Sequence, residues 1–166
     1  MKKLILVVFA LASINSFAQT ADEFYNKGLA KYKVKDFKGA IADYDKAIKL
    51  EPLANYYTNR GHAKADYHDY TSAILDYSKV IEMEPNNALA YYNRAHAYGE
   101  LHEFKSAITD YAKSLELDSN NGHAYFNRGL AKHELNEGKD LGCHDFKKAQ
   151  ELGDKDADEM LKEYCK

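Results

Sequence analysis

Hydrophobic and small residues recur along the chain in two sets that repeat about every 34 residues. Within a repeat, the first helix face comprises positions 4, 8 and 11, with aromatic or small residues at 4 and 8, and the second comprises positions 17, 20, 24 and 27. Residues three or four apart share one face of a helix, so each set predicts a helix of about three turns with one buried face. The pattern therefore predicts one helical hairpin copied four times, in residues 21–53, 54–87, 88–121 and 122–153.

Bulky and small side chains alternate at these positions. Position 4 is aromatic, position 8 is Gly or Ala, and position 24 is aromatic in every unit. In chain order they are Phe24, Tyr57, Tyr91 and Tyr125, then Gly28, Gly61, Ala95 and Gly129, and then Tyr44, Tyr77, Tyr111 and Phe146. Small residues let two helices approach closely, and each ring can then bury about 150–250 Å². This packing accounts for most of the 14 Tyr residues without any ligand.

Residues suited to helix ends stand between the two sets and after them. Asp36 and Asp69 are placed to cap the second helix of their units, and Pro52 and Pro85 are placed to end it. A further helix is predicted in residues 154–166, because Ala157, Met160, Leu161 and Tyr164 form one apolar stripe. We expect this helix to cover the open end of the stack.

This pattern resembles the tetratricopeptide repeat (TPR) family. An aromatic-x-x-[Lys/Arg]-[Gly/Ala] motif recurs in each first helix, and the second helix of the first unit reads Ala40-Ile41-Ala42-Asp43-Tyr44-Asp45-Lys46-Ala47. The resemblance implies an all-α, right-handed superhelix of antiparallel helix pairs with a concave groove. It also implies binding of a protein or peptide, with no catalytic activity common to the family.

The chain departs from the family pattern in two places. Position 7, usually Leu, is Lys27, Arg60, Arg94 and Arg128, and position 23 is Asp43, Asp76, Asp110 and Asp145. We expect these rows to form ion pairs that fix the stacking register, and contact with a charged ligand is the alternative. In the fourth unit one extra residue precedes Gly142, and Gly138 replaces the expected aromatic residue. A looser turn between its two helices is predicted there.

The family geometry implies which residues face a partner. Position 6 is always Asn, whose side chain offers both a donor and an acceptor. With aromatic and His residues at positions 5 and 9, the implied partner-binding groove consists of Asn26, Asn59, Asn93, Asn127, Tyr25, Tyr92, Phe126, His62 and His96. The alternative is that the Asn side chains bond only to neighbouring helices.

One TPR subtype holds a C-terminal carboxylate with Lys and Arg side chains in its groove. The corresponding positions here carry Tyr25, Leu29, Asn59, Leu89 and Asn93. Only Asn59 matches that subtype, so we expect no carboxylate clamp.

The first 18 residues form a separate segment. Lys2 and Lys3 precede an apolar run at 4–12, and small residues stand at 16 and 18. This predicts a secretory signal peptide cleaved after residue 18, because the run is shorter than the roughly 20 residues of a membrane span. An uncleaved anchor is the alternative. We expect an exported protein in a bacterial periplasm or outside the cell, with no stable membrane insertion after cleavage.

The charges exclude some kinds of partner. The chain carries 23 basic and 26 acidic residues with no Lys/Arg-rich run, so binding to nucleic acid is not expected. No basic amphipathic stretch points to a lipid surface.

Two cysteines remain, Cys143 in the second helix of the fourth unit and Cys165 near the C-terminus. In an oxidising compartment an even pair predicts a disulfide. Free thiols and redox chemistry are the alternatives, although no Cys-x-x-Cys motif supports the second.

No catalytic residue, metal site or cofactor is expected. His62 and His96 occupy equivalent positions in successive units, which are separated by more than one helix-packing distance of about 8–10 Å. That separation is too long for two ligands of one zinc ion. The sequence thus predicts a non-catalytic scaffold for a peptide or partner protein. A self-associating structural subunit of an envelope complex is the alternative, and a thiol or metal enzyme would require an exposed, acidic Cys143.

Overall fold

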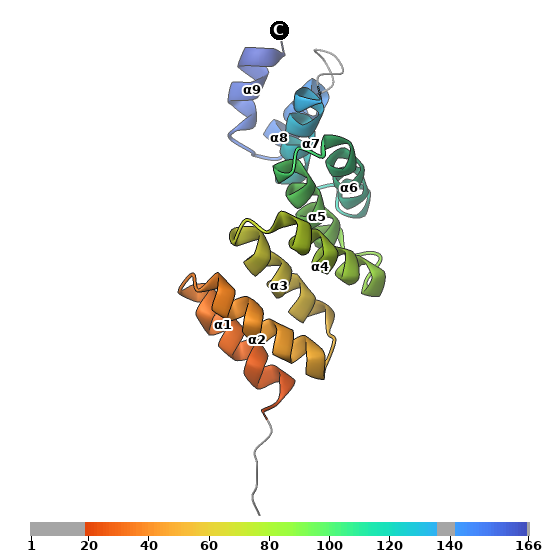
Figure 1. The fold of residues 1–166 in the computed structure, drawn as a ribbon. Helices are drawn as coiled ribbons and strands as arrows, with labels where there is room; N and C mark the ends of the chain where they lie inside the picture. The colour runs from red at the N-terminus through yellow and green to blue at the C-terminus, as the bar shows by residue number, and fades with distance from the viewer. Residues whose placement is uncertain (1–18, 136–141, 166) are drawn as a thin grey trace, which may run out of the picture.

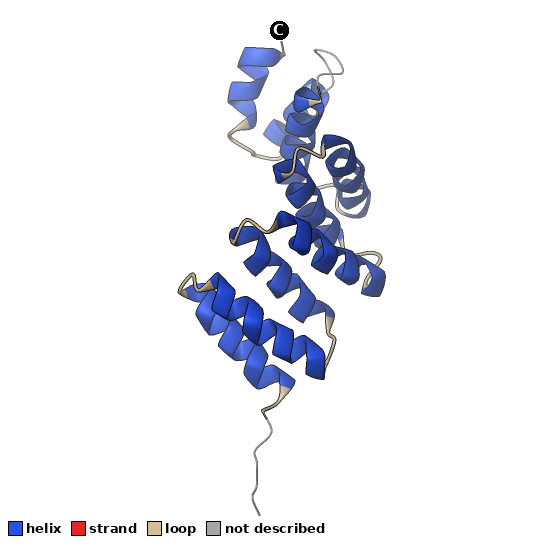
Figure 2. Ribbon diagram, viewed as in Figure 1, coloured by secondary structure: helices blue, strands red, loops and turns tan. Residues whose placement is uncertain are grey.

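Nine α-helices and no strand make up residues 19–135 and 142–165, the part of the chain that the computed structural model describes (Figures 1 and 2). The helices are α1 (Ala21–Lys33), α2 (Phe37–Leu50), α3 (Ala54–Asp66), α4 (Tyr70–Met83), α5 (Ala88–Glu100), α6 (Phe104–Leu117), α7 (Gly122–Glu134), α8 (Cys143–Glu151) and α9 (Ala157–Tyr164). The predicted signal segment and the turn predicted around Gly138 lie outside the described residues.

The helices form four successive pairs that stack along one direction, from α1 at one end to α9 at the other (Figure 1). Each helix contacts mainly the helices before and after it in the sequence, and smaller contacts join α1 to α3 and α5 to α7. The last helix, α9, packs on α8. The predicted all-α stack of helix pairs with a C-terminal helix is confirmed.

The ends of the helices follow from local hydrogen bonding. Oδ1 of Asp36 accepts from the backbone N–H of Gly39 at 2.9 Å, and Oδ1 of Asp69 accepts from that of Ser72 at 3.1 Å, so both predicted caps are present. Asn87 and Asn121 cap α5 and α7 in the same way. Helices α2 and α4 end two residues before a proline.

Three of the turns inside the helix pairs share one backbone conformation. Lys35, His68 and His102 have φ values of 62°, 63° and 58°, in the left-handed region. This conformation costs a side-chain-bearing residue on the order of 1 kcal/mol. It lets the next residue bond back into the helix, as Asp69 N–H does to the Lys64 carbonyl at 2.8 Å. The chain therefore reverses within a few residues, and the two turn histidines lie beside the first helices.

In each pair the core contains an aromatic ring opposite a small residue, which is Ala95 in the third pair and Gly in the other three. Tyr44, Tyr77, Tyr111 and Phe146 are buried. The Tyr77 ring lies so close to Gly61 that a β-carbon there would stand 2.7 Å from Cε1 of the ring. Gly28 and Gly129 face Tyr44 and Phe146 in the same way, as the alternation of small and bulky positions predicted. Close approach of the ring, rather than backbone freedom, explains these glycines.

We expect Gly61→Ala and Gly99→Ala to change stability in opposite directions. Gly99 also lies in a helix, but a β-carbon there would meet no other atom within 4 Å. Gly99→Ala should raise the free energy of unfolding by up to about 1 kcal/mol through helix propensity. Gly61→Ala should lower it by about 1 kcal/mol, because displacement of the Tyr77 ring outweighs that gain. Urea denaturation of both variants measures the difference, and a stabilised Gly61→Ala protein would contradict the explanation.

Candidate functional site

Buried aspartates join the two helices of each pair. Nε and Nη2 of Arg60 donate to the two carboxylate oxygens of Asp76, at 2.9 and 2.6 Å. Arg94 binds Asp110 and Arg128 binds Asp145 in the same two-pronged geometry. The predicted pairing of the two charged rows is confirmed in these three units as an internal structural contact. The fourth pair spans 17 residues rather than 16, so it is kept despite the extra residue between α7 and α8.

The first unit differs, and the pairing predicted for Lys27 is wrong. Nζ of Lys31 lies 2.6 Å from Asp43, whereas Nζ of Lys27 lies 5.6 Å from the centroid of the Phe24 ring. Lys31 stands one helical turn after Lys27 and therefore faces α2. Lys64 and Lys132 stand at the same position in their units and bind the same aspartates as the arginines do. This second row of cations was missed in the sequence, although Lys recurs in it three times.

The most enclosed of these carboxylates is Asp145, which is 0% exposed. Burial acts to raise the pKa of Asp145, but hydrogen bonds from Arg128 and Lys132 outweigh burial and lower the pKa below its ordinary value. Asp145 is therefore ionised in the folded protein at neutral pH.

Stability should fall as the pH drops below about 4. The folded pKa of Asp145 lies below the unfolded one. Its contribution is therefore complete above the unfolded pKa and is lost as the pH falls through the folded pKa. Thermal unfolding of the wild type and of Asp145→Asn, from about pH 7 to about pH 3, checks this linkage. The variant should lose less Tm over the range, and equal losses would show that Asp145 contributes nothing to the acid response.

The row of asparagines lies where successive units meet. Nδ2 of Asn59 donates to the Tyr25 hydroxyl at 3.0 Å, and Nδ2 of Asn127 donates to the Tyr92 hydroxyl at 3.1 Å. Nδ2 of Asn93 lies 3.0 Å from Nε2 of His62, which is neutral because burial lowers its pKa.

These bonds bring six of the nine predicted groove residues together in pairs. Asn59, Asn93 and Asn127 thus bond to neighbouring helices through Nδ2, which leaves the carbonyl oxygen of each amide as an acceptor for a partner. Asn26 is exposed, and no described residue bonds its side chain. Phe126 packs against Phe146, with ring centroids 5.8 Å apart.

We call the side of the stack formed by α1, α3, α5 and α7 the groove face. Two pockets of about 340 and 320 Å³ open there, and we call them the first and the second pocket. Their linings correspond one unit apart: His62 with His96, Asp66 with Glu100, His68 with His102, Tyr77 with Tyr111, and Asn93 with Asn127. His96 lines both pockets. The sequence repeat therefore produces two similar pockets in successive units.

Each pocket combines a tyrosine with a carboxylate. Tyr77 is 2% and Tyr111 is 3% exposed, and burial raises the pKa of each hydroxyl. Neither hydroxyl has a hydrogen-bond partner among the described residues. The Tyr32 hydroxyl donates to Asp66, and burial together with this bond raises the pKa of Tyr32 to about 12. The sequence pattern had placed the tyrosines only in the core.

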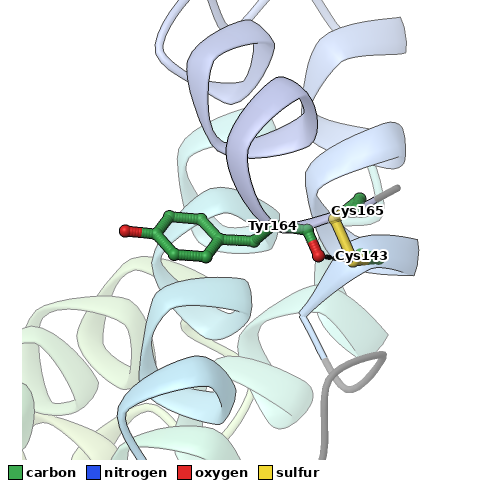
Figure 3. The surroundings of a disulfide bond; sticks show 3 residues. All are labelled: Cys143, Tyr164 and Cys165. Carbon is green, nitrogen blue, oxygen red and sulfur yellow. Dashed lines mark hydrogen bonds between the residues drawn. A yellow bond between two sulfur atoms is a disulfide. The ribbon is translucent and has the colours of Figure 1, made fainter.

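The two cysteines form a disulfide, as predicted, with their Cα atoms 5.6 Å apart (Figure 3). The bond ties the beginning of α8 to the residue that follows α9 (Figure 3). No free thiol is present in the described part of the chain. The exposed, acidic Cys143 that a thiol enzyme would require is therefore absent from this structure.

Residues 19–135 and 142–165 contain no group of three or more His, Cys, Asp or Glu side chains that could hold a metal ion. No helix in these ranges is both long and apolar enough to cross a bilayer.

Two family models match the chain. The model of the tetratricopeptide repeat matches residues 21–52 and 88–121, and a second TPR repeat model matches residues 68–102. No curated protein sequence matches the chain.

Solved structures are similar over most of the chain. The TPR domain of OM64 from Arabidopsis is 31% identical, with a TM-score of 0.65 over 68% of this chain and 94% of that domain. The first TPR of Spaghetti (RPAP3), bound to the HSP90 peptide SRMEEVD, is 26% identical, with a TM-score of 0.68 over 72% of this chain and 95% of that chain. MamA from Desulfovibrio magneticus RS-1 shares the fold at 23% identity, with a TM-score of 0.75 over 80% of this chain and 75% of that one.

Proposed function

Because the chain belongs to the tetratricopeptide repeat family, we propose that it is a non-catalytic scaffold, exported from the cytoplasm, that binds a peptide or partner protein along its groove face. The observation that carries the proposal is the pair of pockets with corresponding linings one unit apart. A repeated surface of this kind suits a ligand that is itself extended, since such a ligand presents side chains at regular intervals.

A similar stack of helix pairs holds a peptide in one of the solved structures, the first TPR of Spaghetti. The peptide there, SRMEEVD, ends in acidic residues. In this chain the positions of the carboxylate clamp carry Tyr25, Leu29, Asn59, Leu89 and Asn93, none of which is a cation. We therefore propose that the groove face binds a different class of segment.

Export is proposed from the N-terminal sequence and supported by the disulfide. The basic residues, the apolar run and the small residues of the first 18 positions match a secretory signal. Disulfides persist in oxidising spaces such as the periplasm and the cell exterior. Partners of the protein should accordingly be sought in the periplasm or the medium.

Filling the pockets tests the proposal. In a His96→Trp/Gly99→Trp variant, the first substitution stands between the two pockets and the second occupies open space in the second pocket. The matched control is Leu75→Trp/Thr109→Trp, at equivalent exposed positions on α4 and α6. Pull-downs from periplasmic extract should recover specific proteins with the wild type and the control but not with the pocket variant. Equal recovery by all three would refute binding on the groove face.

The alternative of self-association is checked with the same proteins. Sizing chromatography over a range of concentrations separates a monomeric scaffold from a stacking subunit. An oligomer that grows with concentration and is abolished by the pocket variant would favour the alternative.

A further inference from the structure

The chemistry of the two pockets indicates what kind of segment they take. We propose that the groove face selects a basic, extended segment whose Lys or Arg side chains enter successive pockets. This inference rests on the proposed function and adds the chemical class of the partner.

Charges are segregated across the first helices. Arg60, Arg94 and Arg128 point away from the pockets and bind buried aspartates of the second helices. The carboxylates Asp66, Glu100 and Glu134 instead line the pockets, and no Lys or Arg is among the described residues that do so. The groove face therefore presents negative charge beside aromatic rings, which is the reverse of a carboxylate clamp.

The hydrogen-bonding groups in the pockets are mainly acceptors. Asp66 receives one bond from the Tyr32 hydroxyl, so its other acceptor sites remain open to a ligand. Burial, together with the carboxylate of Glu100 in the second pocket, raises the pKa of Tyr70, whose hydroxyl lies 3.0 Å from Nδ1 of His68. The Tyr32 hydroxyl holds the Asp66 carboxylate in place.

The buried tyrosines supply a second, independent indication. The hydroxyls of Tyr77 and Tyr111 are unpartnered among the described residues although both side chains are almost entirely enclosed. Each hydroxyl oxygen reaches its pocket rather than being sealed in the core, so a ligand group in the pocket can hydrogen-bond to it. An ammonium or guanidinium group brings only donors and is attracted to the faces of nearby rings. It satisfies the hydroxyl and the carboxylate of one pocket together.

The stacking distance sets the spacing of the basic residues. First helices of successive units make only minor direct contacts, so equivalent pockets lie more than one helix-packing distance of about 8–10 Å apart. An extended peptide advances about 3.3 Å per residue. Basic residues four positions apart lie on the same side of an extended peptide, about 13 Å from each other, and would therefore meet equivalent pockets, whereas adjacent basic residues would point to opposite sides of the ligand.

Fluorescence anisotropy with short labelled peptides tests the inference. One peptide carries two Lys residues four positions apart among Ser and Gly, a second has the same composition with the Lys residues adjacent, and a third carries Glu in place of Lys. The wild type should bind the spaced Lys peptide about tenfold more tightly than the other two, and the preference should shrink as salt is raised.

Two variants with the same change in net charge separate a local from a general effect. Asp66→Asn/Glu100→Gln should weaken binding of the spaced Lys peptide about tenfold. Glu82→Gln/Glu116→Gln should leave it unchanged, because those carboxylates pair with Lys79 and Lys113 on the second helices. Tyr77→Phe/Tyr111→Phe should also weaken binding several-fold while thermal stability is retained, since no internal hydrogen bond is lost.

The outcomes distinguish this inference from the function on which it rests. Equal binding of Lys and Glu peptides, equal loss in the two charge-matched variants, or no binding of the Lys peptide would each overturn the basic-segment inference. In any of these cases a partner recovered by the wild type and lost only from the His96→Trp/Gly99→Trp variant would still support the scaffold. Failure of both experiments would remove the groove face as a binding surface.

Discussion

Arg94→Met should lower the free energy of unfolding by about 3–5 kcal/mol. Asp110 is only 6% exposed, and within the described residues Arg94 is the only cation at ion-pair distance from it. The substitution would leave a carboxylate buried without a counter-charge. Removing one partner of a buried ion pair in this way destabilises a protein more than replacing both partners does. Urea denaturation followed by far-UV circular dichroism measures the loss.

Arg60→Met is the matched control. Asp76 keeps Lys64 at 2.8 Å when Arg60 is removed, so this loss should be clearly smaller than that of Arg94→Met. A second control replaces both partners, because Arg94→Met/Asp110→Leu removes the buried charge along with its counter-charge. The double variant should recover most of the stability. Equal losses for Arg60→Met and Arg94→Met would mean that the second cation contributes nothing.

Cys165→Ser should lower the free energy of unfolding of the C-terminal hairpin by about 3 kcal/mol, according to the chain-entropy model for a closed loop of this length. The disulfide joins residues 22 apart in the sequence. Helix α9 has 8 residues, which is too short to be stable alone. Besides the disulfide, it is held by buried Ala157 and by the contact between the Tyr164 and His133 rings.

The loss should be confined to one end of the stack. Hydrogen exchange of Cys165→Ser should be faster in α8 and α9 than in the wild type, while α1 to α4 keep their protection. The reduced wild type should behave like the variant, and Cys143→Ser/Cys165→Ser should show no further change. Faster exchange throughout the chain would contradict a local role for the bond.

The helices were predictable because the same spacing is written into the sequence four times. Other units carry a small residue and an aromatic ring at the positions of Gly61 and Tyr77, so the pattern predicted that these positions face each other. The arginine–aspartate pairs followed for the same reason, since both rows stand on facing sides of one helix pair. The repeats therefore allowed these contacts to be predicted without the tertiary structure.

The bonds between units could not be predicted from the same pattern, because each depends on which residue the preceding unit offers. Asn59 and Asn127 find a tyrosine hydroxyl at position 5 of the preceding unit, but in the second unit that position is Thr58. The Thr58 hydroxyl instead donates to the Ala54 carbonyl at 2.9 Å. Asn93 consequently turns to His62.

The two pockets also could not be predicted from the sequence. Each needs residues from three or four helices, and the enclosure of Tyr77 beside Asp66 emerges only when the neighbouring unit is in place. The side chains of Tyr77 and Tyr111, which their spacing assigns to the core, therefore also line the pockets of the candidate site.

Because each helix contacts mainly the helices before and after it in the sequence, the stack should respond to a pulling force along its length in a defined order. A force applied to the two ends would act on every interface between units in turn along the stack. The covalent loop between Cys143 and Cys165 cannot lengthen under that load, whereas nothing covalent closes the hairpin of α1 and α2. Rupture should begin at α1 and travel toward the C-terminal end, so that the protein yields to tension one hairpin at a time.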